Sequence, residues 1–380
     1  MIYLDAAATT PVKREVLEAM WPYLTGEFGN PSSHHGVGES ASRALADARR
    51  TLAEWLGCRP AEVVFTSGGT EADNLAVKGI ALGNPRGRHV VLSAVEHPAV
   101  VESVEFLERM HGFAVSVVPV DRYGLIDPDA FAEVLRPDTT LATVMTANNE
   151  IGTVQPIARL GEIARAAGVP FHSDAVQAAG WLDVRLDSLG VDALSISGHK
   201  LGAPKGVGVL AVRQRLLLEP VVHGGGQERG RRSGTENVAF AVGLAAAVRS
   251  MSPADVAAAA ARTTALRDEF IGVVLREVPD ARFTGHPQLR LPSVASFCFP
   301  GTSGEAVLLQ LEERGVIVSS GSACAAGSDD PSPVLLAIGL APEVAQTAVR
   351  FTLTPDTTRD ELTAAAHALR DSVAALAALR

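Results

Sequence analysis

Short apolar runs alternate with amphipathic stretches between about residue 40 and residue 215. The stretch Glu39–Leu56 has apolar residues at three- and four-residue steps and is followed by Gly57, which is typical of a helix and its C-terminal cap. The apolar runs predict buried strands at Val63–Thr66, His89–Ser93, Ala114–Val118, Leu141–Thr146, Val169–Ser173, Ala193–Ser197 and Val207–Val212. Helical segments separate most of them, so we expect an α/β fold with a mainly parallel, doubly wound sheet.

The pattern changes beyond about residue 250. It predicts a long helix (Ala254–Val278), a strand (Val294–Phe299), a helix (Gly304–Arg314) and a last helix that opens with the capping box Thr358–Glu361. This order indicates a smaller α+β domain. We expect a large domain at residues 12–250 and a small domain made of residues 1–11 and 251–380, which carries a small-residue loop at 319–331.

Composition narrows the functional classes. The net charge of −10 and the lack of a basic run argue against direct nucleic-acid binding. No apolar stretch is long enough for a membrane span, and the first residues do not resemble a signal peptide. The three cysteines are too scattered for a disulfide framework or a permanent metal site. We therefore expect a cytoplasmic protein with reduced thiols and no membrane partner.

An acid and an amine follow two of the predicted strands. Asp174 comes directly after the strand Val169–Ser173, and Lys200 follows Ala193–Ser197. The carboxyl ends of parallel strands form the ligand-binding edge of such a sheet. Pyridoxal 5'-phosphate (PLP) needs an acid for its ring nitrogen and a lysine for its aldehyde. A helix-capping Asp and a solvated Lys are the alternative interpretation.

A glycine-rich turn follows the strand Val63–Thr66. The residues Ser67-Gly68-Gly69-Thr70 precede a helix, whose first backbone N–H groups, with the Thr70 hydroxyl, are suited to one phosphate. A tight turn that needs glycine for its backbone is equally compatible. The motif matches neither a P-loop nor a dinucleotide fingerprint.

Three further polar side chains follow strand ends, one of them (Gln177) three residues beyond Asp174, and line the same crevice. His97 is positioned to stack on a cofactor ring and move protons, while Asn149 and Gln177 are positioned to hydrogen-bond the cofactor's phenolic oxygen. Taken singly, each is unremarkable, and His97 alone would more often be a helix-entry residue.

Cys324 stands in a loop of small residues, where nothing bulky is available to bury its sulfur. A structural cysteine normally lies in a core, as we expect for Cys298 within its strand and, more loosely, for Cys58 beside a helix end. Cys324 is therefore the candidate nucleophile.

Arg350 lies inside an otherwise apolar strand. A guanidinium in that position needs a partner, and a bidentate substrate carboxylate is one candidate. A structural salt bridge to Asp or Glu is an equally good alternative.

These residues, in this order, resemble the cysteine desulfurases, PLP enzymes of the class V aminotransferase fold (fold type I). The resemblance runs from residue 3 to about residue 353. Its motifs are Tyr3-Leu4-Asp5, Ala8-Thr9-Thr10-Pro11, Phe28-Gly29-Asn30-Pro31-Ser32-Ser33-His34, Ser67-Gly68-Gly69-Thr70-Glu71, Glu96-His97, Ala147-Asn148-Asn149-Glu150-Ile151-Gly152, Asp174-Ala175-Val176-Gln177, Ser197-Gly198-His199-Lys200, His223-Gly224-Gly225-Gly226-Gln227-Glu228 and Ser319–Cys324.

The resemblance implies a function and a set of roles. L-cysteine would become L-alanine, with its sulfur carried as a persulfide on Cys324 to an acceptor such as an iron–sulfur scaffold, or into other thiolation pathways. Lys200, Cys324 and His97 would be catalytic, and Arg350 and Asn149 would bind the substrate. The implied cofactor ligands are Gly69, Thr70, His97, Asn149, Asp174, Gln177, Ser197, His199, Lys200 and Thr235. Cys324 would touch a nascent cluster only transiently.

The resemblance also implies a homodimer in which Thr235 of one chain completes the phosphate site of the other. From the residues alone, the Gly- and Arg-rich segment His223–Asn237 suits a phosphate, and an ordinary surface loop is the alternative.

Departures from the family pattern are local, at Ala6-Ala7, Leu201-Gly202-Ala203-Pro204 and Thr354-Pro355-Asp356, and none removes a chemical group. A selenocysteine lyase or related PLP β-eliminase shares most of the site, and a non-catalytic sulfur-transfer scaffold is the alternative from another class.

Overall fold

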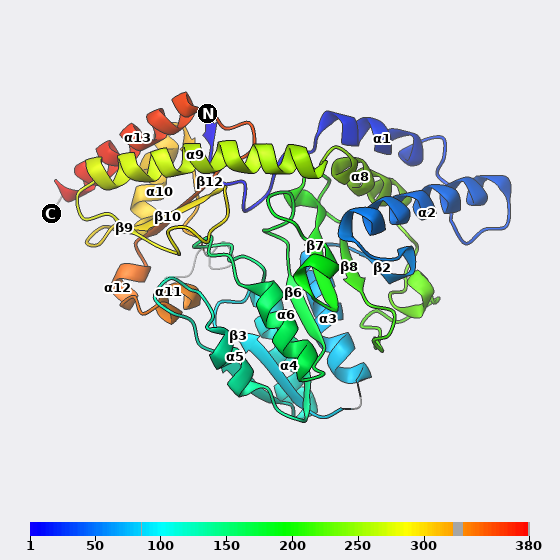
Figure 1. Ribbon diagram of the computed structural model, residues 1–380. Helices are drawn as coiled ribbons and strands as arrows, with labels where there is room; N and C mark the ends of the chain where they lie inside the picture. Colours follow the sequence, from blue (N-terminus) through cyan, green and yellow to red (C-terminus); the bar gives the residue numbers. More distant parts are fainter. Residues whose placement is uncertain (85, 322–329, 379–380) are drawn as a thin grey trace.

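The computed structural model describes residues 1–84, 86–321 and 330–378 (Figure 1). Its main sheet has seven strands. In spatial order they are β2 (Val63–Thr66), β8 (Gly208–Val212), β7 (Ala193–Ser197), β6 (Phe171–Asp174), β5 (Thr139–Thr143), β3 (His89–Ser93) and β4 (Ala114–Val118). Only β8 runs against the others within this sheet. The predicted mainly parallel sheet is confirmed.

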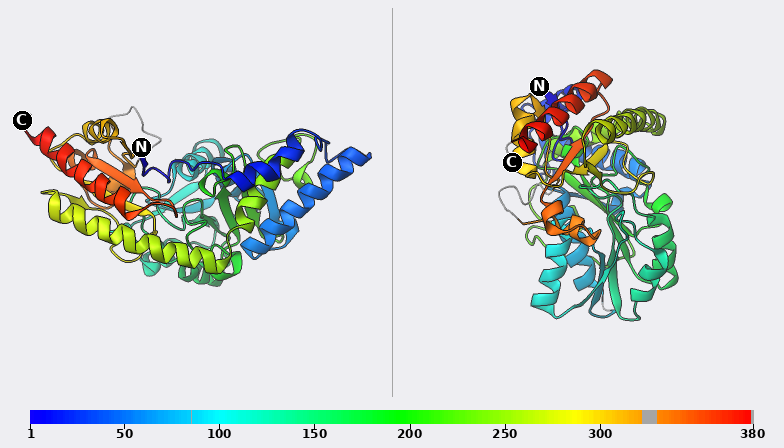
Figure 2. Two further views of the ribbon diagram at one scale, coloured as in Figure 1. Left: turned by 90° about the horizontal axis from the view of Figure 1, so that it is seen from above. Right: turned by 90° about the vertical axis from the view of Figure 1, so that its left-hand side faces the viewer.

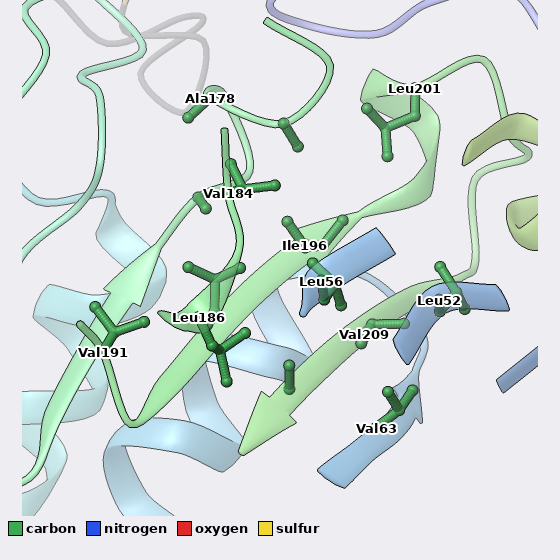
Figure 3. Close-up of a cluster of buried hydrophobic side chains, with 14 of the residues drawn as sticks. Leu52, Leu56, Val63, Ala178, Val184, Leu186, Val191, Ile196, Leu201 and Val209 are labelled. Atoms are coloured by element: carbon green, nitrogen blue, oxygen red, sulfur yellow. The ribbon is translucent and has the colours of Figure 1, made fainter. Parts of the chain in front are cut away.

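Helices cover both faces of this sheet, as the continuous apolar runs of its strands require. One face packs against α2 (Gly36–Leu56), α6 (Ile157–Ala166) and α8 (Val238–Arg249), and the other against α3 (Gly69–Gly83) and α4 (Pro98–His111). Alternate residues of a strand serve the two cores, as Val63 and Val64 do. Figure 3 shows Leu52 and Leu56 of α2 against the first core.

The expected strand ends differ slightly from those observed. The strand expected at Leu141–Thr146 is β5, which starts at Thr139 and ends at Thr143. Its pairing with β6 nevertheless continues, because Val144 N donates to His172 O (3.1 Å) and Thr146 N to Asp174 O (2.8 Å). The chain therefore stays extended up to the residues that face the crevice.

A second, antiparallel sheet has the order β12-β10-β9 and contains the other strand expected from the sequence. Its strands are β12 (Ala348–Thr352), β10 (Val294–Cys298) and β9 (Arg282–Phe283). A separate core joins it to α9 (Pro253–Glu277), α10 (Gly304–Glu313) and α13 (Arg359–Ala377). Figure 2 shows α9 and α13 side by side along this sheet.

The N-terminal segment links the two sheets. Its first strand, β1 (Ile2–Tyr3), pairs in parallel with β11 (Val316–Ile317), and Asp5 bridges to Thr352 of β12. The chain then crosses to α1 (Arg14–Leu24), which packs on α8. The domain boundaries given above remain a prediction.

Short helices complete the chain: α5 (Pro128–Val134), α7 (Leu186–Leu189), α11 (Pro333–Ala337) and α12 (Pro342–Ala345), with single turns η1 (Pro60–Glu62), η2 (Gly198–Lys200) and η3 (Glu228–Gly230). Of the helices in the described part of the chain, none has the length and apolar character needed to cross a bilayer.

Candidate active site

Asp174 and Lys200 stand at the carboxyl ends of neighbouring strands, β6 and β7. Asp174 is buried, and its Oδ1 accepts a hydrogen bond from Val176 N at 2.8 Å. Burial raises the pKa of Asp174, while the charges of His97 and Lys200 lower it. The Lys200 ammonium, and a proton on His97 when that ring carries one, therefore favour the ionised form of Asp174 against the effect of its burial.

His97 is the N-cap residue of α4, which agrees with the alternative of a helix-entry residue. It also lies close enough to Asp174 to feel its charge. Its Nδ1 accepts a hydrogen bond from Ala99 N at 3.1 Å, which leaves Nε2 to carry the proton of a neutral ring. Burial lowers the pKa of His97, Asp174 raises it, and Lys200 lowers it. A mainly neutral imidazole can accept or donate a proton near neutral pH.

The glycine turn after β2 forms a close-fitting cradle. Thr66 Oγ1 donates to Gly68 O at 2.9 Å, and α3 begins at Gly69. A Cβ on Gly69 would lie 2.8 Å from Val176 Cγ2 and 3.4 Å from Ser197 Cβ, so a side chain at Gly69 would collide with the floor of the crevice. The turn is thus packed against Val176, two positions after Asp174, and Thr70 is the second residue of α3.

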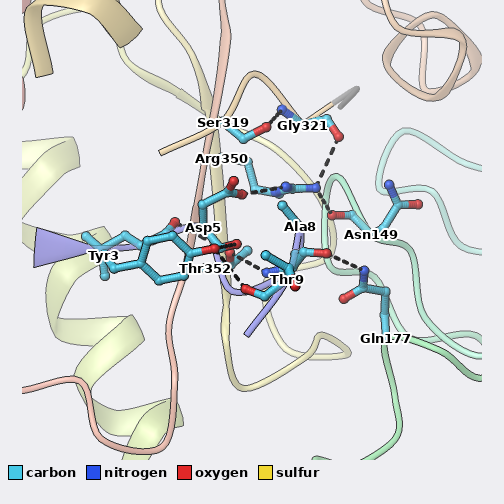
Figure 4. A network of polar contacts seen from close by, with 12 residues as sticks. Tyr3, Asp5, Ala8, Thr9, Asn149, Gln177, Ser319, Gly321, Arg350 and Thr352 are labelled. Atoms are coloured by element: carbon cyan, nitrogen blue, oxygen red, sulfur yellow. Dashed lines mark hydrogen bonds and ion pairs between the residues drawn. The ribbon is translucent and has the colours of Figure 1, made fainter. Parts of the chain in front are cut away.

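The N-terminal segment forms a wall of the site that the sequence did not reveal. Lys200 Nζ donates to Ala8 O at 2.7 Å and also to Ala7 O. Gln177 Nε2 donates to Ala7 O at 3.1 Å (Figure 4). Because these partners are backbone carbonyls, no residue type marks them, and only the motif-like spacing of residues 8–11 offered a signal.

His199 and Ser197 flank the lysine turn. His199 Nδ1 lies 3.2 Å from Thr9 Oγ1, and burial lowers the pKa of His199 to about 4, so its ring is neutral. Ser197 is buried at the end of β7. Both therefore lie beside the cradle and the N-terminal wall.

Arg350 is buried, and both terminal nitrogens of its guanidinium have partners (Figure 4). Its Nη1 donates to Asn149 O (2.8 Å) and Gly321 O (3.1 Å), and its Nη2 lies 2.9 Å from Asp5 Oδ1. Its Nε is buried without a hydrogen-bond partner among the described residues. The structural salt bridge considered from the sequence is thus present, and one donor of the fork is still unused.

Cys324 lies outside the described residues, but described residues on either side of it contact Arg350 and Glu150. Gly321 O accepts from Arg350, and Ser332 Oγ donates to Glu150 Oε2 at 2.5 Å. The other two thiols are ill suited to attack, since burial raises the pKa of both Cys58 and Cys298 to about 12. Cys298 is buried, as expected.

The segment His223–Asn237 is anchored to α2 by a buried ion pair. Glu228 is buried and takes two hydrogen bonds from Arg49, Nη1–Oε2 at 2.6 Å and Nη2–Oε1 at 2.8 Å. This ion pair holds Glu228 and Arg229 at φ values of 48° and 59°, which residues other than glycine rarely adopt. Thr235 at its end is exposed and borders a cavity of about 260 Å³ beside Ser67.

A cluster of buried titratable groups beneath Asp174 was not predicted. Asp73 of α3, Glu96 and His172 are all buried. Burial is the largest cause that raises the pKa values of Asp73 and Glu96, and the negative charge of Asp174 raises both further. His172 Nε2 lies 3.0 Å from Ser195 Oγ. Three close carboxyls cannot all be ionised at low dielectric, and the Lys200 ammonium favours the charge on Asp174 over a charge on Asp73 or Glu96.

The arrangement fits PLP. The close-packed turn at Gly69 and Thr70 would hold its phosphate, Asp174 its ring nitrogen, Lys200 its aldehyde carbon, and His97 is placed to cover the ring. Asp174, Lys200 and His97 lie close together at one edge of the sheet, and their roles toward PLP stay a prediction.

Comparisons with known proteins point the same way. The family described as aminotransferase class-V matches residues 2–364. "Cysteine desulfurase IscS" of Dictyoglomus turgidum is 46% identical over 362 residues, which are 95% of this chain and 91% of that protein. "Cysteine desulfurase IscS" of Methanosarcina thermophila is 44% identical and covers 93% of this chain and 87% of its own length.

A solved structure described as "NIFS-LIKE PROTEIN" is similar with a TM-score of 0.91 at 34% identity, covering 99% of this chain and 100% of that one. Another, "SspA in complex with cysteine", is similar with a TM-score of 0.82 at 38% identity, covering 94% of this chain and 100% of that one.

Proposed function

Since the chain belongs to the class V aminotransferase family and, within it, to the PLP-dependent cysteine desulfurases, we propose that it converts L-cysteine to L-alanine and carries the sulfur as a persulfide on Cys324. The observation that supports this most directly is the buried Asp174 with the Lys200 amine and the His97 imidazole beside it. That trio supplies an acid for a ring nitrogen, an amine for an aldehyde and a proton carrier at one sheet edge.

The residues divide the chemistry among them. PLP, when bound, supplies the electron sink for the substrate's Cα. Asp174 would keep the ring nitrogen protonated, Lys200 would hold the cofactor through its aldehyde carbon and move the Cα proton, and His97 would take the proton of the substrate thiol. The Cys324 thiolate attacks the substrate sulfur, so that an S–S bond forms as the Cβ–S bond breaks. A proton added at Cβ then completes alanine.

Arg350 would bind the substrate carboxylate together with Asn149. The donor that supports this is the buried, unpartnered Nε of Arg350. Asn149 stands next to it, because Arg350 Nη1 already holds the Asn149 carbonyl.

The wider setting belongs to the same proposal. The protein would act as a homodimer in a reducing cytoplasm and pass sulfur to an acceptor such as an iron–sulfur scaffold. Thr235 is exposed at the end of an anchored segment, as a residue that serves a partner chain must be.

The decisive experiment replaces Lys200 with alanine. The K200A protein should lose the borohydride-reducible bond to PLP and all production of alanine and sulfide, because Lys200 is the amine at the strand end beside Asp174. K205A, which removes an exposed lysine of the same segment, is the matched control and should retain both. A reducible bond that persists in K200A would show that Lys200 is not the lysine that holds the cofactor.

A further inference from the structure

An acidic side chain stands inside the turn that we assign to the phosphate. Glu71 directly follows Thr70 in the first turn of α3, and its Oε2 accepts a hydrogen bond from Ser67 N at 2.8 Å. Burial would raise the pKa of Glu71, but hydrogen bonds from Arg232 and Ser67 lower it overall, so the carboxylate is ionised. A negative charge at this place opposes the binding of a phosphate dianion.

Arg232 covers this carboxylate with both prongs of its guanidinium. Nε lies 2.7 Å from Oε1 and Nη2 lies 3.1 Å from Oε2. The side chains of Arg232 and Glu71 are 24% and 17% exposed, so the pair is weakly screened by solvent. The Glu71 hydrogen bond raises the pKa of Arg232, and the charges of Glu228 and Glu236 raise it further.

Of the two other acids near this arginine, Glu228 is already paired with Arg49, and Glu236 borders the same cavity as Arg232. Arg232 is therefore the cation available to Glu71 in the described contacts of the turn. It also stands three residues before Thr235, on the segment His223–Asn237, and so ties that segment to the phosphate turn of its own subunit.

We propose that Arg232 is a positioning residue of the cofactor site, which neutralises Glu71 so that the Ser67–Thr70 turn can accept a phosphate dianion. The inference rests on the proposed function, because it requires the cofactor phosphate at this turn. Arg232 does not need to touch the phosphate. Its effect on cofactor affinity acts through the charge of Glu71, and removing that charge should make Arg232 dispensable.

The test is a double-mutant cycle on PLP affinity, measured by titrating the full-length apoprotein with PLP and following its visible absorbance. R232Q should weaken PLP binding by roughly 10- to 100-fold, the range expected when one charged hydrogen-bond partner is lost. E71Q should bind PLP at least as well as the wild type, because the amide oxygen can still accept from Ser67. The double variant E71Q/R232Q should recover to within a few fold of the wild type.

R231Q is the matched control, because it removes one positive charge from the same segment, where Arg231 donates to Ala61 O and not to Glu71. It should bind PLP within about threefold of the wild type by the additivity expected for an independent site. Equal weakening by R231Q and R232Q, wild-type affinity in R232Q, or a double variant as weak as R232Q would each overturn the proposal.

If R232Q does not fold, the pair R232K and R232K/E71Q replaces it, since lysine keeps the charge but loses the fork. R232K should bind more weakly than the wild type and recover when Glu71 is neutralised, and a lack of recovery would overturn the proposal. A wild-type protein that binds no PLP would instead overturn the proposed function, so the two failures are distinguishable.

Discussion

Arg350 and Asp5 form an ion pair inside the protein, with Arg350 Nη2 2.9 Å from Asp5 Oδ1. The partners are 345 positions apart in the chain and meet because the N-terminal segment bridges to β12. This contact gives Arg350 a structural partner, and its unused Nε gives it a donor for a ligand. Both interpretations of Arg350 therefore have a physical basis, and mutation can separate them.

If Arg350 binds the substrate carboxylate, R350A should raise KM for cysteine by about 10- to 100-fold, the cost of a lost charged hydrogen bond. The PLP absorbance spectrum should not change, because Arg350 holds substrate and not cofactor. D5N is the matched variant, since it removes only the ion pair and leaves the guanidinium in place. A lower melting temperature in R350A with an unchanged KM would establish a structural role alone.

The order of the elements could be predicted because most strands of the main sheet are buried on both faces and read as short apolar runs, although the edge strand β4 is partly exposed. Asp174 and Lys200 were found for the same reason: they are the polar residues with which two such runs end. Their closeness followed from the common edge of parallel strands.

Other parts of the site could not be predicted, because they depend on long-range packing. The carbonyls of Ala7 and Ala8 reach Lys200 only through the crossing of the N-terminal segment, and backbone groups leave no sequence signal. His172 and Asp73 lie within elements that read as core. The position of His172 depends on the register of β6 against β7, and the packing of α3 on the sheet brings Asp73 Oδ1 to 3.8 Å from His172 Nε2.

The role of Cys324 is tested by C324S. A serine hydroxyl is hardly ionised near neutral pH, whereas an ordinary thiol is already a few per cent thiolate. We expect C324S to bind PLP and cysteine with normal spectra but to form no protein persulfide, as measured by mass spectrometry. C58A is the control and should form persulfide normally, because burial raises the pKa of the Cys58 thiol to about 12. Persulfide on C324S would assign the sulfur to another cysteine.

Thr235 should link cofactor binding to dimerisation. If its hydroxyl completes the phosphate site of a partner chain, T235V should lower PLP affinity by roughly tenfold, the effect of one hydrogen bond to a charged group. Because PLP would then bind the dimer better than the monomer, cofactor should also strengthen the dimer in sedimentation experiments. T235S, which keeps the hydroxyl, is the control. A fully active, PLP-saturated monomer would contradict both expectations.

The buried cluster beneath Asp174 makes stability depend on pH in two opposite directions. Glu96 is buried, its Oε1 accepts from Met145 N at 2.9 Å, and its Oε2 has no partner among the described residues. Burial raises the pKa of Glu96 from 4.5 to about 8. Burial lowers the pKa of His172 from 6.5 to about 3.

Between pH 4.5 and about 8 the folded protein keeps the Glu96 proton that the unfolded chain has lost, so stability falls as pH rises through this window. Between pH 6.5 and about 3 His172 binds a proton in the unfolded chain but not in the folded protein, so stability falls as pH decreases. Each group contributes a slope of about 1.4 kcal/mol per pH unit within its window.

The free energy of unfolding, measured with urea from pH 4 to 9, should therefore change shape in two variants. E96Q should not lose stability as pH rises through this window, because its amide cannot ionise. Its free energy of unfolding relative to the wild type should therefore grow between pH 5 and 8. The free energy of unfolding of H172Q should instead increase relative to that of the wild type as pH falls below about 6.5. Both amides keep a donor and an acceptor for the neighbouring hydroxyls, Ser93 for Glu96 and Ser195 for His172. Parallel curves for E96Q and the wild type would mean that Glu96 is already ionised in the folded protein, and its assignment as a neutral neighbour of Asp174 would be wrong.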